Sequence, residues 1–117
     1  MTKRKPNEAV ASVSEIDPKQ VERRASAKRT ALAVAESALD RKAQNVEIID
    51  VVGKVDYADY VIVMSGQSDR QVAAIAKNVK KDVEGNSAAR CLSVEGLPQA
   101  TWVLMDFGDV IVHIFHE

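Results

Sequence analysis

The sequence predicts a single α/β domain, in which a mixed β-sheet is covered by helices mainly on one side. A chain of 117 residues can bury one modest core but not two. Helical and strand patterns follow one another in the order α-β-β-α-β-β-β. A strand, a crossover helix and a further strand precede a terminal hairpin, so the sheet needs both parallel and antiparallel neighbours.

The segment 101–117 is the predicted hairpin. Gly108-Asp109 is its two-residue loop, because Gly supplies the positive φ that a type II′ turn requires first. The resulting register divides the two strands into two faces. One face is entirely apolar and is assigned to the core: Val103, Met105, Phe107, Val110, Val112 and Ile114. The other is the candidate binding face, because it mixes apolar side chains with a carboxylate and an imidazole: Trp102, Leu104, Ile111, Phe115, Asp106 and His113.

Residues 1–16 are polar and without periodicity, which predicts a mobile tail before a domain at residues 17–117. Asp17-Pro18-Lys19-Gln20 is typical of a helix start, with Gln20 completing a capping box. The helix is expected to end near Asn45. Residues at helical spacing are predicted to form the face that lies on the sheet: Val21, Ala25, Leu32, Ala35, Leu39 and Ala43.

The middle of the chain predicts a strand at 46–52 and a second at 60–64, the latter apolar enough to be covered on both faces. Ser68 and Gln71 form a capping box that starts a second helix, which ends at Gly85. Its core residues are Val72, Ile75, Ala76, Val79 and Val83. A short strand is expected at 89–94.

Charge is distributed unevenly along the chain. The whole chain has a net charge of −1, but residues 45–117 hold six Lys or Arg against eleven Asp or Glu, a net charge of −5. An acidic domain is unfavourable for direct nucleic-acid binding and suits a basic protein partner. The single Cys91 and the lack of a membrane-spanning run indicate a reducing compartment, most simply the cytoplasm.

Three motifs suggest enzymatic or metal chemistry, and each has a simpler explanation. Asp106-Phe107-Gly108 matches the kinase magnesium triplet, but the other kinase motifs are lacking. His113 and His116 lie three apart on a strand, which places their imidazoles on opposite faces. Gly66-Gln67-Ser68 resembles a nucleotidyltransferase turn, but Ser68 is already explained as a helix cap. We therefore expect no catalytic residue, cofactor or metal; a nucleotide-using enzyme of nucleotidyltransferase-like fold remains the alternative.

Taken together, several segments resemble one known family. They are Asp59-Tyr60-Val61-Ile62, the stretch from Ser65-Gly66 through Ser68-Asp69-Arg70-Gln71-Val72 to Ala74-Ile75-Ala76, Glu95-Gly96, and most of the stretch from Trp102 to Glu117. In this pattern the chain is similar to the ribosomal silencing factor family, also called Iojap, over roughly residues 46–117.

The resemblance implies a fold related to nucleotidyltransferases that lacks their catalytic carboxylates. It implies a factor that binds large-subunit ribosomal protein fourteen and sterically blocks joining of the two ribosomal subunits, which represses translation. Family members are often dimeric when free, and neither a membrane nor a specific nucleic-acid sequence is an expected partner. We expect six residues to contact the partner: Trp102, Leu104, Asp106, Asp109, His113 and Phe115.

Overall fold

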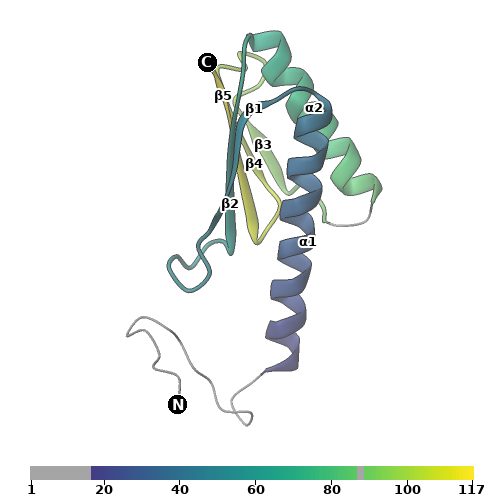
Figure 1. The fold of residues 1–117 in the computed structure, drawn as a ribbon, viewed down its shortest axis with the longest axis vertical. Coiled ribbons are helices and arrows are strands. Elements are labelled where there is room, and N and C mark those ends of the chain that lie inside the picture. Colours follow the sequence, from purple (N-terminus) through teal and green to yellow (C-terminus); the bar gives the residue numbers. More distant parts are fainter. Residues whose placement is uncertain (1–16, 87–88) are drawn as a thin grey trace.

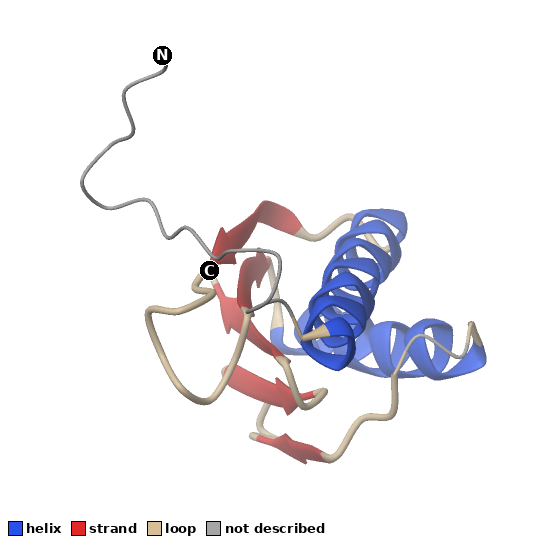
Figure 2. Ribbon diagram, turned by 90° about the horizontal axis from the view of Figure 1, so that it is seen from below, coloured by secondary structure: helices blue, strands red, loops and turns tan. Residues whose placement is uncertain are grey.

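Two layers build the fold: a five-stranded sheet and two helices, α1 and α2, on one side of it (Figure 1). The computed structural model describes residues 17–86 and 89–117, so the tail predicted for residues 1–16 lies outside the described residues. Seen end-on, both helices lie against one face of the sheet, and no described helix covers the other (Figure 2). We call this uncovered side the open face. Neither described helix is long and apolar enough to cross a membrane.

The strands lie side by side in the order β1-β2-β5-β4-β3. Their bounds are Gln44–Asp50 for β1, Tyr60–Gly66 for β2, Ser93–Glu95 for β3, Trp102–Asp106 for β4 and Val110–His116 for β5. β2 and β5 are parallel, whereas the other neighbours are antiparallel. The predicted mixed sheet and order of elements are therefore confirmed. The first strand starts earlier than predicted, and the third is confined to Ser93–Glu95 instead of residues 89–94.

Helix α1 spans Pro18–Asp40 and begins at the predicted cap. The Asp17 side chain accepts the N–H of Lys19 at 3.0 Å, but Gln20 makes no return bond among the described residues, so the predicted capping box is half formed. The helix ends before Asn45 because Lys42 takes a positive φ of 61°, a conformation that a helix cannot continue through. β1 therefore begins at Gln44.

The buried face of α1 differs from the predicted one. Val21, Leu32 and Leu39 are 55%, 54% and 60% exposed, so their assignment to the sheet-facing side is wrong. The buried positions are small or polar instead: Ala27, Thr30, Ala31, Val34, Ser37 and Ala38. Close contact with α2 favours such side chains. The Ser37 hydroxyl donates to Asp82 Oδ2 at 2.8 Å, which satisfies its polar atom between the helices.

Strand β2 lies inside the sheet but is covered on only one face. Ile62 and Met64 point to the helices and are 0% and 2% exposed. Val61 and Val63 alternate with them on the open face and remain half-buried. The prediction that this strand is covered on both faces is wrong, since a continuous apolar run carries no sign of which face meets solvent.

Helix α2 spans Asp69–Gly85, close to the prediction. Ser68 Oγ accepts the N–H of Gln71 at 3.1 Å, which confirms the cap. The return bond differs: Gln71 Oε1 accepts the N–H of Gln67 at 2.6 Å rather than that of Ser68. All five predicted core positions are buried: Val72, Ile75, Ala76, Val79 and Val83.

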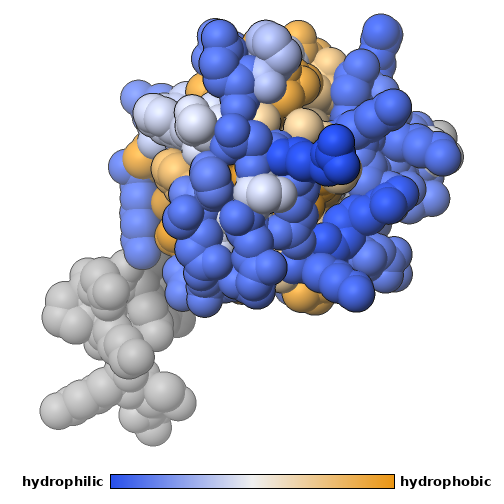
Figure 3. Space-filling view, turned by 90° about the horizontal axis from the view of Figure 1, so that it is seen from above, coloured by the Kyte–Doolittle hydropathy of each residue, from blue (hydrophilic) through white to orange (hydrophobic). Residues whose placement is uncertain are grey.

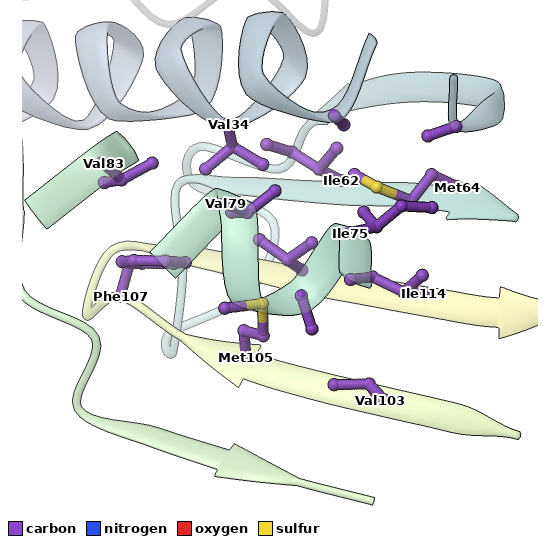
Figure 4. Packing of buried hydrophobic residues seen from close by; sticks show 14 of the residues in the cluster. Val34, Ile62, Met64, Ile75, Val79, Val83, Val103, Met105, Phe107 and Ile114 are labelled. Carbon is purple, nitrogen blue, oxygen red and sulfur yellow. The ribbon is translucent and has the colours of Figure 1, made fainter. Parts of the chain in front are cut away.

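The hairpin has the predicted register. Phe107 N–H donates to the Val110 carbonyl at 2.9 Å, and Gly108 takes a φ of 90° in the two-residue loop. The predicted core face is confirmed, with each of its residues at most 5% exposed: Val103, Met105, Phe107, Val110, Val112 and Ile114. Of these, Val103, Met105 and Ile114 point from β4 and β5 towards α2 (Figure 4), and the whole set belongs to one core cluster with Ile75 and Val79.

Candidate interface on the open face of the sheet

The open face brings together side chains from adjacent strands in matched rows. Leu104 lies opposite His113, and Asp106 opposite Ile111, as the sequence predicted. Parallel β2 continues these rows, because Val61 pairs with Ile111 and Val63 with His113. These rows are therefore apolar apart from the His113 imidazole and the Asp106 carboxylate.

Three rings form a stacked group at one end of this face, which we call the aromatic plate: Trp102, His113 and Phe115. Their centroids lie 5.7 to 6.0 Å apart, and their planes differ by 7 to 24°. Trp102 is 54% exposed and Phe115 40% exposed. Stacking therefore fixes the rings in one orientation while leaving a broad aromatic surface open to solvent.

A hydrogen bond between two of the rings fixes the charge state of the plate. The indole N–H of Trp102 donates to His113 Nδ1 at 3.1 Å, so Nδ1 must be unprotonated and the ring proton sits on Nε2. Burial also lowers the pKa of His113, because desolvation disfavours the imidazolium form. Both effects keep the plate neutral near pH 7.

A shallow depression of about 450 Å³ adjoins the plate. Phe115 forms one wall, and the remaining walls come from β1 and β2, including Val63, Ser65 and the exposed Glu47. The depression extends the apolar surface towards the β1 edge of the sheet. A protruding partner side chain could be accommodated next to the exposed rings.

Carboxylates surround the apolar centre. Exposed Glu47 lies on β1 opposite Val63 of β2, and exposed Glu95 lies on β3 opposite Leu104 of β4. Asp106 lies between them in a different setting: its Oδ1 accepts the N–H of Gly108 at 2.7 Å, so this half-buried carboxylate also holds the hairpin turn. The rim is therefore acidic, with one of its charges tied to the backbone.

Asp109 is separated from the other predicted site residues. Its carboxylate lies 2.9 Å from Arg23 Nη1, which comes from α1 on the helical side of the sheet. The same guanidinium is 4.0 Å from Asp59 Oδ2, a buried atom that has no hydrogen-bond partner among the described residues. Asp109 therefore links the hairpin turn to α1, whereas the other five predicted residues share the open face.

The neighbouring strands add residues that sequence reasoning missed: Glu47, Ile49, Val61, Val63 and Glu95. Strand order was the missing information, because the hairpin alone does not say that β2 lies beside β5. Because alternate residues of a strand point to opposite faces, the sequences of β1 and β2 could have shown which residues belong to the open face. That signal was weak, since both strands carry apolar side chains on each side.

The histidines lie on different sides of β5. His113 belongs to the plate, whereas His116 Nδ1 is 2.7 Å from Asp69 Oδ1 at the start of α2. Within residues 17–86 and 89–117, no group of three or more His, Cys, Asp or Glu is arranged to hold a metal ion.

Comparison with known proteins identifies the family of this chain. A family model described as "Ribosomal silencing factor during starvation" matches residues 24–117. The chain belongs to the ribosomal silencing factor family. It is 40% identical over 78 residues to a ribosomal silencing factor of Bacillus subtilis, covering 67% of this chain and 65% of that protein. It is 39% identical over 82 residues to one from Zymomonas mobilis, covering 70% and 61%. The chain thus spans somewhat less than two thirds of the length of these relatives.

Solved structures share the fold. A protein from Bacillus halodurans superposes with a TM-score of 0.70 at 35% identity, over 76% of this chain and 82% of that chain. A protein from Chromobacterium violaceum superposes with a TM-score of 0.73 at 28% identity, over 77% and 74%. The architecture that supports the open face is therefore common to this chain and to these two bacterial proteins.

Proposed function

We propose that this chain is a non-enzymatic regulator that binds the large ribosomal subunit through ribosomal protein fourteen and blocks joining of the small subunit. Membership of the ribosomal silencing factor family supports the ribosome as the target. The proposal places the chain in the cytoplasm with its target and includes a homodimer as the free form.

The observation that carries this proposal is the aromatic plate on the open face. Trp102 and Phe115 are 54% and 40% exposed although they are large apolar rings, and stacking holds them in place. Preorganised, exposed aromatic side chains are a common source of binding energy between proteins, because little conformational freedom is lost when they are covered.

The acidic rim supports a basic protein as the partner. Glu47 and Glu95 flank the apolar centre on opposite sides, and neither forms an ion pair among the described residues. Such charges raise the rate of encounter with a basic surface and set its orientation. Many ribosomal proteins are basic because they contact RNA, so the rim and plate together fit a partner of this kind.

Steric exclusion needs no chemistry beyond this contact. A domain that covers ribosomal protein fourteen on the large subunit occupies space that the small subunit needs, so binding and inhibition are the same event. Inhibition by steric exclusion requires only that the chain dissociates from the large subunit slowly enough to remain bound during repeated encounters with the small subunit.

Binding to purified components tests the proposal. The chain should co-sediment with isolated large subunits and bind purified ribosomal protein fourteen, and it should not co-sediment with small subunits. Binding to large subunits without binding to protein fourteen would reject the named partner. A nucleotide-using enzyme is the competing function: saturating nucleotide with Mg²⁺ would then raise the Tm, because a ligand of the folded state stabilises it.

A further inference from the structure

Five exposed cationic residues lie along α2 and in the turn after α1, and we call them the basic patch: Arg41, Lys42, Arg70, Lys77 and Lys81. Three of them follow helical spacing along one side of α2, with Ala74 between Arg70 and Lys77. The other two lie in the turn after α1. The Gln71 side chain fixes that turn against α2, because its Nε2 donates to the carbonyls of Arg41 and Lys42 at 3.3 and 3.2 Å.

Three members of the patch, Arg41, Lys77 and Lys81, line a depression of about 280 Å³. Its lining is cationic and amide-bearing without a carboxylate: Arg41, Ala74, Lys77, Asn78 and Lys81. The small Ala74 side chain leaves the floor low between longer cationic side chains. The site is therefore a recess with positive charge at its walls, large enough for a phosphate group.

The positive charge of the basic patch is not neutralised by carboxylates in the part of the chain that the structure describes. Among the described residues, no member of the basic patch forms an ion pair. The acidic residues of α2 nearest in sequence have other contacts: Asp69 lies 2.7 Å from His116, and Asp82 accepts from Ser37 at 2.8 Å. Asp40 lines a neighbouring depression instead. The acidic net charge of residues 45–117 thus conceals a local cationic surface.

We propose that the basic patch binds the phosphate backbone of RNA without regard to base sequence, as a second contact beside the protein contact. The inference rests on the proposed function, because a ribosomal subunit presents RNA phosphates close to its proteins. Unpaired Lys and Arg side chains around a recess provide the donors that phosphate oxygens accept.

The position of the patch allows both contacts at once. α1 and α2, which carry or adjoin the patch, lie on one side of the sheet (Figures 1 and 2). The rings of the plate alternate along β4 and β5 with the buried core residues and therefore face the other side, so neither region covers the other. Both reach the end of the molecule where α1 stops and β5 ends, and hydrophilic side chains dominate this end (Figure 3). Asp69 joins the two regions, because it contacts His116 next to Phe115 and directly precedes Arg70.

Fluorescence anisotropy with a labelled 20-base-pair RNA duplex of mixed sequence tests this proposal. At 50 mM salt we expect a Kd on the order of 10⁻⁵ M for the full chain, weakening steeply as salt rises. Lys77→Glu with Lys81→Glu should weaken binding by tenfold or more and reduce the salt slope by about two. Circular dichroism on the same samples confirms that the exposed substitutions leave the helix intact.

A matched control separates the patch from overall charge. Lys19→Glu with Arg24→Glu makes the same change in net charge on exposed residues at the other end of α1, and these residues form no ion pair among the described ones. Binding by this control should fall by less than threefold. If the control lost as much RNA affinity as the patch variant, the loss would be due to net charge alone, and the proposal would be overturned.

Two further outcomes would also overturn it. No binding up to 100 μM at 50 mM salt rejects the RNA contact, and loss only in a chain carrying Lys3→Gln, Arg4→Gln and Lys5→Gln assigns RNA binding to the N-terminal cluster. Binding to isolated ribosomal protein fourteen is measured in parallel. If the chain binds ribosomal protein fourteen but not RNA, only the RNA-binding role of the patch is rejected. If it binds RNA but not ribosomal protein fourteen, only the proposed function is rejected.

Discussion

Truncating Trp102 to alanine should weaken ribosome binding far more than it weakens the fold. The ring is 54% exposed, so about 130 Å² of a side chain of roughly 250 Å² is available to a partner. At about 25 cal/mol per Å² this area corresponds to about 3 kcal/mol, or about a hundredfold in Kd. The covered part of the ring packs on His113 and Phe115, which are themselves partly exposed. We therefore expect a loss of only about 1–2 kcal/mol in unfolding free energy.

Urea unfolding and binding to large subunits are measured on the same Trp102→Ala sample. Leu39→Ala is the matched control, because Leu39 is 60% exposed but lies on α1, on the other side of the sheet. The control should bind like the natural chain. A Trp102→Ala chain that binds normally, or one that is unfolded in buffer, would refute the reasoning, and equal losses in both variants would deny the open face any special role.

Three further predictions concern the fold and its pH dependence. Ser68→Ala should cost about 1 kcal/mol in urea unfolding, because Ser68 Oγ caps the Gln71 amide at 3.1 Å; an unchanged midpoint would contradict this. Gly96→Ala should cost about 3 kcal/mol or more, because φ is 101° and the new Cβ would meet the Trp102 carbonyl oxygen; calorimetry showing a near-natural Tm would be incompatible with this geometry. Burial holds the pKa of His113 below its ordinary value of 6.5, so its contribution to stability is complete above that pH and is lost as pH falls towards the folded pKa. His113→Phe should reduce the acid sensitivity between pH 7 and 5, and identical pH profiles would refute the assignment.

Local chemistry made much of the fold predictable. The Gly108-Asp109 turn sets the register of β4 and β5, and the apolar stripe of α2 matches its buried face residue for residue. Both are cases in which neighbours in sequence are neighbours in space. The same reasoning found five of the six candidate site residues on the open face, because they all belong to one hairpin.

Contacts between distant segments account for what sequence reasoning missed. Helix α1 buries Ala31 and Ser37 and exposes Leu32 and Leu39, since packing against α2 rewards small side chains that approach closely. Asp109 pairs with Arg23, which is 86 positions away, so nothing in the turn sequence predicts it. The contribution of β2 to the open face likewise depends on its parallel pairing with β5.

Joining of ribosomal subunits is the most direct test of the central claim. Light scattering follows association of purified small and large subunits after the large subunits have been incubated with the chain. We predict that one chain per large subunit reduces the association signal, and that Trp102→Ala at the same concentration leaves it close to the level without added chain. Undiminished association on large subunits that demonstrably carry the chain would contradict the account.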